Sequence, residues 1–184
     1  MVMRFGMFNI FEILLLVKPF ALIYNICMNL EEKVACLLIQ NRKTLAIAES
    51  CTGGLLANRL TNISGSSKFF KAGLVTYSNE AKMKCLNVAR QVLQKYGAVS
   101  EQTCLSLAKN VRRLFNSDFG IGISGIAGPT GATKSKPIGL TYIALSTKDE
   151  IICLRCQFRG NRLQIKSQAA SQALKLLLEF LPQR

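Results

Sequence analysis

Histidine is absent from all 184 residues of this chain. Its absence excludes Ser-His-Asp and Cys-His catalysis and every metal site that requires an imidazole ligand. An enzyme with this sequence that moves protons near neutral pH must therefore use Lys, Tyr, Asp, Glu or Cys. Lysine is the strongest candidate, because burial lowers the pKa of its ammonium group towards the working range.

Acidic residues are scarce as well. Ten Asp and Glu stand against 24 Lys and Arg, which gives a formal charge of +14. The basic residues are scattered and aromatic residues do not interleave with them, so we expect no nucleic-acid partner. A basic surface of this kind also attracts phosphorylated small molecules.

The seven cysteines form no metal-binding pattern. Cys153 and Cys156 lie three positions apart in a strand-like run, so their side chains point to opposite faces. We interpret the cysteines as small buried side chains in a reducing cytoplasm, with no metal and no cofactor.

The first 28 residues are rich in Phe, Leu and Ile and are interrupted by Arg4, Glu12 and Lys18. The longest uncharged stretch, Pro19 to Leu30, is too short to span a bilayer, and no signal-peptide cleavage pattern ends the segment. We interpret residues 1–28 as an apolar extension outside the fold, with a peripheral membrane anchor as the alternative. Residues 29–184 are expected to form one domain.

Helix and strand patterns alternate through that domain. The expected helices cover residues 30–40, 54–61, 81–86, 89–96, 100–115 and 162–181. The expected strands cover residues 45–48, 73–77, 118–124, 138–147 and 151–158, and the last two form a hairpin. This order predicts an α/β fold, a three-layer α/β/α sandwich with a mixed, mainly parallel sheet.

Two loops have compositions that favour ligand binding: one connects a strand to a helix and the other connects two strands. Ala48–Gly54 reads A-E-S-C-T-G-G and places hydroxyls at a helix start, where free N–H groups favour anions. An ordinary helix N-cap is the alternative. Ser124–Pro129 reads S-G-I-A-G-P and offers glycines and N–H groups suited to phosphate, with a simple crossover as the alternative.

Three sets of loop residues are expected to converge at the strand ends, where open α/β sheets bind ligands. They are residues 49–54, residues 65–67 together with 77–82, and residues 124–131. Tyr77 and Lys82 are each expected to reach a serine hydroxyl, although a solvated helix charge is the alternative for Lys82. Arg162 follows a strand at a helix start and is suited to clamp a phosphate.

These strings together resemble the C-terminal domain of the competence/damage-inducible protein CinA, a family that includes stand-alone PncC-type nicotinamide-nucleotide amidohydrolases. The resemblance covers the chain from about residue 30 onwards, and the nucleotide-hydrolysing N-terminal domain of full-length CinA lies outside it. The matching strings are A-E-S-C-T-G-G (48–54), G-S-S (65–67), V-T-Y-S-N-E-A-K (75–82), G-A-V-S-E (97–101), S-G-I-A-G-P (124–129), P-I-G (137–139) and G-N-R (160–162).

The resemblance implies metal-free hydrolysis of the carboxamide of nicotinamide mononucleotide to nicotinic acid mononucleotide and ammonia. We expect a cytoplasmic homodimer in which Ser67 is the nucleophile, Lys82 the base and Tyr77 a proton relay. Ser50 and the Thr52–Gly54 backbone would then stabilise the oxyanion, and the exchange of roles between Ser50 and Ser67 stays open. The implied substrate-binding residues are Glu49, Thr52, Gly53, Gly54, Asn79, Ser124, Gly125, Gly128 and Arg162.

Two other classes of function are considered. A non-catalytic nucleotide-binding module would not need Ser50, Ser67, Tyr77 and Lys82 together, and the chain has all four. A competence factor that binds nucleic acid would need a DNA-binding motif, and the sequence contains none that is recognisable.

Overall fold

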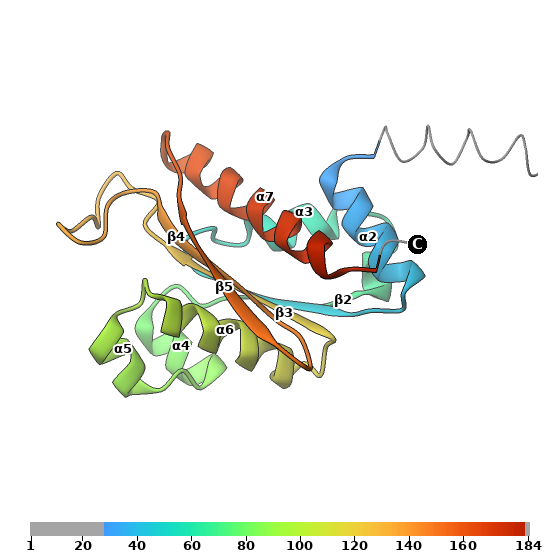
Figure 1. Cartoon of the computed structure of the whole chain (residues 1–184), viewed down its shortest axis with the longest axis horizontal. Helices are drawn as coiled ribbons and strands as arrows, with labels where there is room; N and C mark the ends of the chain where they lie inside the picture. Colours follow the sequence, from blue (N-terminus) through green and yellow to red (C-terminus); the bar gives the residue numbers. More distant parts are fainter. Residues whose placement is uncertain (1–27, 183–184) are drawn as a thin grey trace, which may run out of the picture.

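The computed structural model describes residues 28–182, in which helices and strands alternate as expected (Figure 1). The largest shift from the predicted bounds is in the second strand, which begins at Phe70 instead of residue 73 and ends at Val75. The elements are α2 (Leu30–Gln40), β1 (Leu45–Glu49), α3 (Leu55–Thr61), the 3-10 helix η1 (Ser66–Lys68), β2 (Phe70–Val75), α4 (Asn79–Leu86), α5 (Arg90–Tyr96), α6 (Glu101–Leu114), β3 (Phe119–Gly125), β4 (Leu140–Ser146), β5 (Ile151–Gln157) and α7 (Arg162–Phe180).

The five strands form one mixed sheet in the order β2-β1-β3-β4-β5, which confirms the predicted fold class. β1 pairs in parallel with β2 and β3, whereas β4 is antiparallel to β3 and to β5. β1, β2 and β3 therefore end at the same edge of the sheet. The chain runs from β1 outwards to β2 and returns past β1 to β3, so this edge contains a topological switch point, where open α/β sheets bind ligands.

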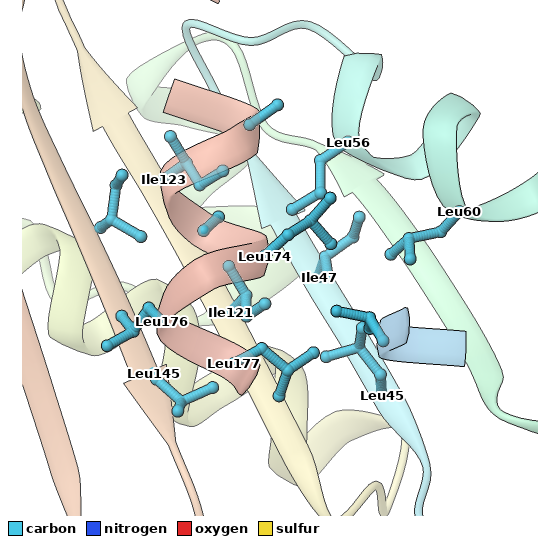
Figure 2. Packing of buried hydrophobic residues seen from close by; sticks show 14 of the residues in the cluster. Leu45, Ile47, Leu56, Leu60, Ile121, Ile123, Leu145, Leu174, Leu176 and Leu177 are labelled. Atoms are coloured by element: carbon cyan, nitrogen blue, oxygen red, sulfur yellow. The ribbon is translucent and has the colours of Figure 1, made fainter. Parts of the chain in front are cut away.

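Helices cover both faces of the sheet: α2, α3 and α7 lie on one face, and α4, α5 and α6 on the other (Figure 1). Large aliphatic side chains fill the first interface. Leu174 and Leu177 of α7 pack there against Ile47 of β1 and Ile121 of β3 (Figure 2). Burial of these apolar side chains holds α7 on the strands whose ends form the switch point.

Small residues line the second interface, under α6. Ala46 and Ala48 of β1 and the glycines of β3 take this side of the sheet. A Cβ atom at Gly120 would lie 2.3 Å from the carbonyl oxygen of Ala108, and one at Gly122 would lie 2.6 Å from another carbonyl oxygen of α6. The helix therefore packs directly on the backbone of the sheet.

Residues 1–27 lie outside the described part of the chain, so the extension expected at residues 1–28 stays a prediction. Between residues 28 and 182, no helix has both the length and the apolar character needed to cross a bilayer.

Candidate active site

A pocket of about 270 Å³ opens at the switch point. Its walls come from the segments that follow β1, β2 and β3, from the segment before α6 and from the first residue of α7. Within the described residues, two cationic side chains and no acidic side chain line it. The lining residues are Ser50, Cys51, Tyr77, Lys82, Ala98, Val99, Ser124, Gly125, Ile126, Ala127, Gly128, Thr130, Gly131 and Arg162.

Lys82 lies on α4 with its side chain in the wall of the pocket, and it is only 1% exposed. Its Nζ atom donates to Thr76 O at 2.7 Å, to Ser50 Oγ at 3.2 Å and to Tyr77 O at 3.4 Å. Burial lowers the pKa of Lys82 below 10.5, because the charged ammonium loses its hydration. The most buried cation of the pocket is thus in contact with a serine hydroxyl.

The three acceptors around Lys82 also determine how its neutral form is oriented. A neutral amine has two N–H groups and one lone pair. The carbonyl oxygens of Thr76 and Tyr77 can accept both N–H groups, which leaves the lone pair for the Ser50 hydroxyl. The geometry therefore suits Lys82 to act as a base on Ser50.

Local contacts hold these two residues together. The N–H of Thr76 donates to Glu49 O at 2.9 Å, which extends the pairing of the β1 and β2 ends by one residue. The Ser78 hydroxyl then accepts from Ala81 N at 3.0 Å and caps α4. Because only three residues separate β2 from α4, the first turn of the helix places Lys82 next to the turn that follows β1.

Glu49 was expected to contact the substrate, but in the structure its carboxylate binds the backbone at the start of α3. Its side chain is buried, and its carboxylate accepts from the backbone N–H groups of Gly54 (3.0 Å), Leu56 (3.2 Å) and Ala57 (2.8 Å). These bonds correct the expectation that free N–H groups at this helix start attract a ligand anion. The chain's own carboxylate already occupies them.

Two N–H groups of the Thr52–Gly54 backbone are committed in the same way. Gly53 N–H donates to Ser50 O at 3.1 Å, and Gly54 N–H donates to the Glu49 carboxylate. Neither of these two donors is therefore free to stabilise an oxyanion, and a role for the Thr52 N–H group stays a prediction. Gly53 and Gly54 instead adopt φ values of +61° and +91°, which allow the tight turn into α3 and strain residues with a side chain. Thr52 is fully buried outside the pocket lining.

Cys51 is the neighbour of Ser50 in the pocket wall and was not among the expected site residues. Burial raises the pKa of its thiol to about 11, so the thiol stays protonated near neutral pH. A protonated, buried thiol is a poor nucleophile, and Ser50 is the better candidate. Among residues 28–182, no three Cys, Asp or Glu side chains gather closely enough to hold a metal ion.

Ser67 lies far in space from Ser50 and Lys82. It belongs to η1, which precedes β2, whereas Ser50 follows β1. Because β1 and β2 are parallel, with Leu45 opposite Phe70, Ser67 lies at the opposite edge of the sheet, about 16 Å away along a five-residue strand. The structure thus corrects the expectation that Ser67 and Lys82 meet in one pocket: Ser50 is beside Lys82, and Ser67 is exposed.

Tyr77 and Arg162 contact each other at the pocket. Arg162 donates from Nη2 to Tyr77 Oη at 2.9 Å and from Nη1 to Gly128 O at 2.6 Å. The Tyr77 side chain is 61% exposed and its hydroxyl is bonded to Arg162 instead of Lys82, so its role as a proton relay stays a prediction. The pair links α7 to the loops that follow β2 and β3.

The remaining expected residues fall into two groups. Ser124 and Gly125 line the pocket, and Ser124 Oγ donates to Ala98 O at 2.7 Å. Asn79 lines a separate hollow with Met83. Ala98 and Val99 were not predicted as site residues, although the G-A-V-S-E string at residues 97–101 was a signal for them.

Comparison with known proteins gives consistent matches. The sequence model of the CinA C-terminal domain matches residues 28–181. A putative competence-damage inducible protein of Thermoanaerobacter sp. (strain X514) is 47% identical over 152 residues, which cover 83% of this chain and 37% of that protein. A CinA-like protein of Syntrophus aciditrophicus (strain SB) is 49% identical over 153 residues, which cover 83% of this chain and 36% of that protein. The chain therefore spans little more than a third of the length of these relatives.

The crystal structure of a competence or damage-inducible protein from Enterobacter asburiae is similar to this structure. The TM-score is 0.80 and the sequence identity 35%, over 83% of this chain and 96% of that one.

Proposed function

Because the chain belongs to the CinA C-terminal domain family, we propose that its pocket hydrolyses the carboxamide of nicotinamide mononucleotide to nicotinic acid mononucleotide and ammonia. The contact between the buried Lys82 amine and the Ser50 hydroxyl supports this proposal most strongly. A serine nucleophile requires an adjacent base, and a buried lysine can supply one in a chain without histidine.

The reaction would proceed through an ester on Ser50. Neutral Lys82 takes the hydroxyl proton while Oγ attacks the carboxamide carbon, and a tetrahedral oxyanion forms. Lys82 then returns the proton to the amide nitrogen, the C–N bond breaks and ammonia leaves. A water molecule, deprotonated by Lys82, attacks the ester carbon, so that the acid is released and Ser50 regains its proton.

The charge of the pocket supports a mononucleotide as the substrate. Arg162 gives the pocket a positive charge even when Lys82 is neutral, and no acidic side chain among the described residues lines it, so the pocket suits an anionic ligand. Arg162 lies at the mouth and is the expected partner of the phosphate, while the carboxamide has to reach Ser50.

The test compares two serine variants of the full chain. Ser50→Ala should abolish ammonia release from nicotinamide mononucleotide, by at least about a thousandfold in kcat, because the attacking atom is lost. Ser67→Ala is the matched control and should keep the wild-type rate, since Ser67 lies at the other edge of the sheet.

Ammonia and nicotinic acid mononucleotide are measured together, to exclude other sources of ammonia. Substantial turnover by Ser50→Ala would rule out the proposed nucleophile. A wild-type protein that binds the mononucleotide without releasing either product would be the non-catalytic binding module instead.

A further inference from the structure

Two cationic side chains project from the same face of α7 beside the pocket. Arg162 and Lys166 are four residues apart on the helix, a spacing that places their Cβ atoms about 6 Å from each other. Arg162 lines the pocket and is oriented by Gly128 O and Tyr77 Oη. Lys166 is not among the residues that the sequence indicated.

Lys166 reaches over the turn that carries Ser50. A Cβ atom built on Gly53 would lie 3.4 Å from Lys166 Nζ, so the ammonium group lies beside this turn at the distance of a neighbouring side chain. Gly53 has no side chain to cover it. Lys166 itself does not line the pocket, but its ammonium group lies beside the Ser50–Gly54 turn, whose first two residues do.

The charge of Lys166 is not neutralised by an acidic side chain within residues 28–182. The ion pairs of this part of the chain join Lys43 to Asp118, Arg59 to Glu31 and Lys84 to Glu80. Glu49, the buried acidic residue of the described chain, has its carboxylate bonded to three backbone N–H groups at the start of α3. Lys166 is a partly buried residue whose charge has no acidic partner among the described residues, which leaves its ammonium group available to a ligand anion.

We infer that Lys166 binds the phosphate of the substrate together with Arg162 and thereby makes the site selective for phosphorylated ligands. This inference rests on the proposed function and adds a residue to it. Because the helix start at α3 is already filled by Glu49, the anion has to be met by side chains, and α7 supplies two of them one turn apart. Arg162 supplies planar, directed donors, and Lys166 supplies a flexible point charge.

The first experiment measures steady-state kinetics of Lys166→Met. For nicotinamide mononucleotide, KM should rise about ten- to a hundredfold with kcat nearly unchanged, because a charge-assisted contact outside the reacting bonds is lost. For nicotinamide riboside, which lacks the phosphate, kcat/KM should stay at the wild-type value. Lys175→Met removes the same charge from an exposed position of α7 and should leave both substrates unaffected. If Lys166→Met and Lys175→Met had the same KM for the mononucleotide, the inference would be overturned.

A second measurement does not depend on turnover and separates this inference from the proposed function. Inorganic phosphate should raise the midpoint of thermal unfolding of the wild type and of Lys175→Met, and should raise that of Lys166→Met less. If the wild type releases no ammonia, the proposed function fails, and the phosphate titration alone then decides on Lys166. Equal shifts in the two lysine variants, or no shift in the wild type, would overturn the anion site.

Discussion

Lys82→Met keeps most of the length of a buried side chain and removes its amine. The wild-type amine contacts Ser50 Oγ and two main-chain carbonyl oxygens, and no other side chain among residues 28–182 is hydrogen-bonded to the Ser50 hydroxyl. Cys51 cannot replace it as a thiolate, since burial raises the pKa of the thiol to about 11. General-base catalysis contributes about 10²- to 10⁴-fold, so kcat should fall by that factor, which corresponds to roughly 3–5.5 kcal/mol of activation free energy.

The same substitution should change how stability depends on pH. Burial lowers the pKa of Lys82 in the folded protein, whereas the unfolded chain keeps a value near 10.5. Between these two values the unfolded state holds one more proton than the folded state. The free energy of unfolding of the wild type therefore rises with pH across that window, by up to about 1.4 kcal/mol per pH unit. Lys82→Met should lose this rise.

The assay is ammonia release from nicotinamide mononucleotide at a series of pH values, with urea unfolding at the same values. In the wild type, kcat/KM should rise with pH through the lowered pKa of Lys82, because only the neutral amine acts as a base. Lys84→Met is the matched control, since Lys84 lies on the same helix in an exposed ion pair with Glu80. A folded Lys82→Met protein with kcat within about tenfold of the wild type would refute the reasoning.

Two further substitutions test the scaffold around the site. Gly120→Ala should lower the free energy of unfolding by about 3 kcal/mol or more in urea titrations, because its Cβ would lie 2.3 Å from Ala108 O and 2.5 Å from Arg112 Cβ; a loss below about 1 kcal/mol would show that α6 moves away easily. Glu49→Gln should lower the free energy of unfolding by about 1–3 kcal/mol, because the carboxylate has two acceptor oxygens for three backbone N–H groups and an amide has only one. The Gln variant should also lower kcat by loosening the Ser50 turn, and an unchanged kcat with reduced stability would separate the turn from catalysis.

The sequence predicted the fold well because strand and helix patterns are local. It also predicted that Ser50 and Lys82 belong to one site, since each follows a strand of the same sheet. It misplaced Ser67, although the order of elements contains the reason: a loop that leads from a helix into a parallel strand lies at the amino edge of the sheet. The direction of each connection therefore decides which loops share a pocket.

The roles of Glu49 and Lys166 were harder to predict, because both depend on contacts that the sequence pattern does not show. Glu49 follows a strand in a polar motif and is typical of a ligand-binding residue, yet its carboxylate bonds to the helix that comes next. Lys166 lies on a helix that contains several polar residues, and its position beside Gly53 depends on how α7 crosses the sheet. Its spacing of four residues from Arg162 was the only signal in the sequence.

The direct packing of α6 on the sheet backbone has a consequence for how this scaffold can change during evolution. Positions 120 and 122 have no room for a side chain, so the α6 face cannot be remodelled by single substitutions. Exposed residues lie at the pocket at the start of α7 and in the loop between β3 and β4. New ligand preferences should therefore arise from α7 and from residues 129–138, and a mutagenesis library aimed at other nucleotides is best confined to these two segments.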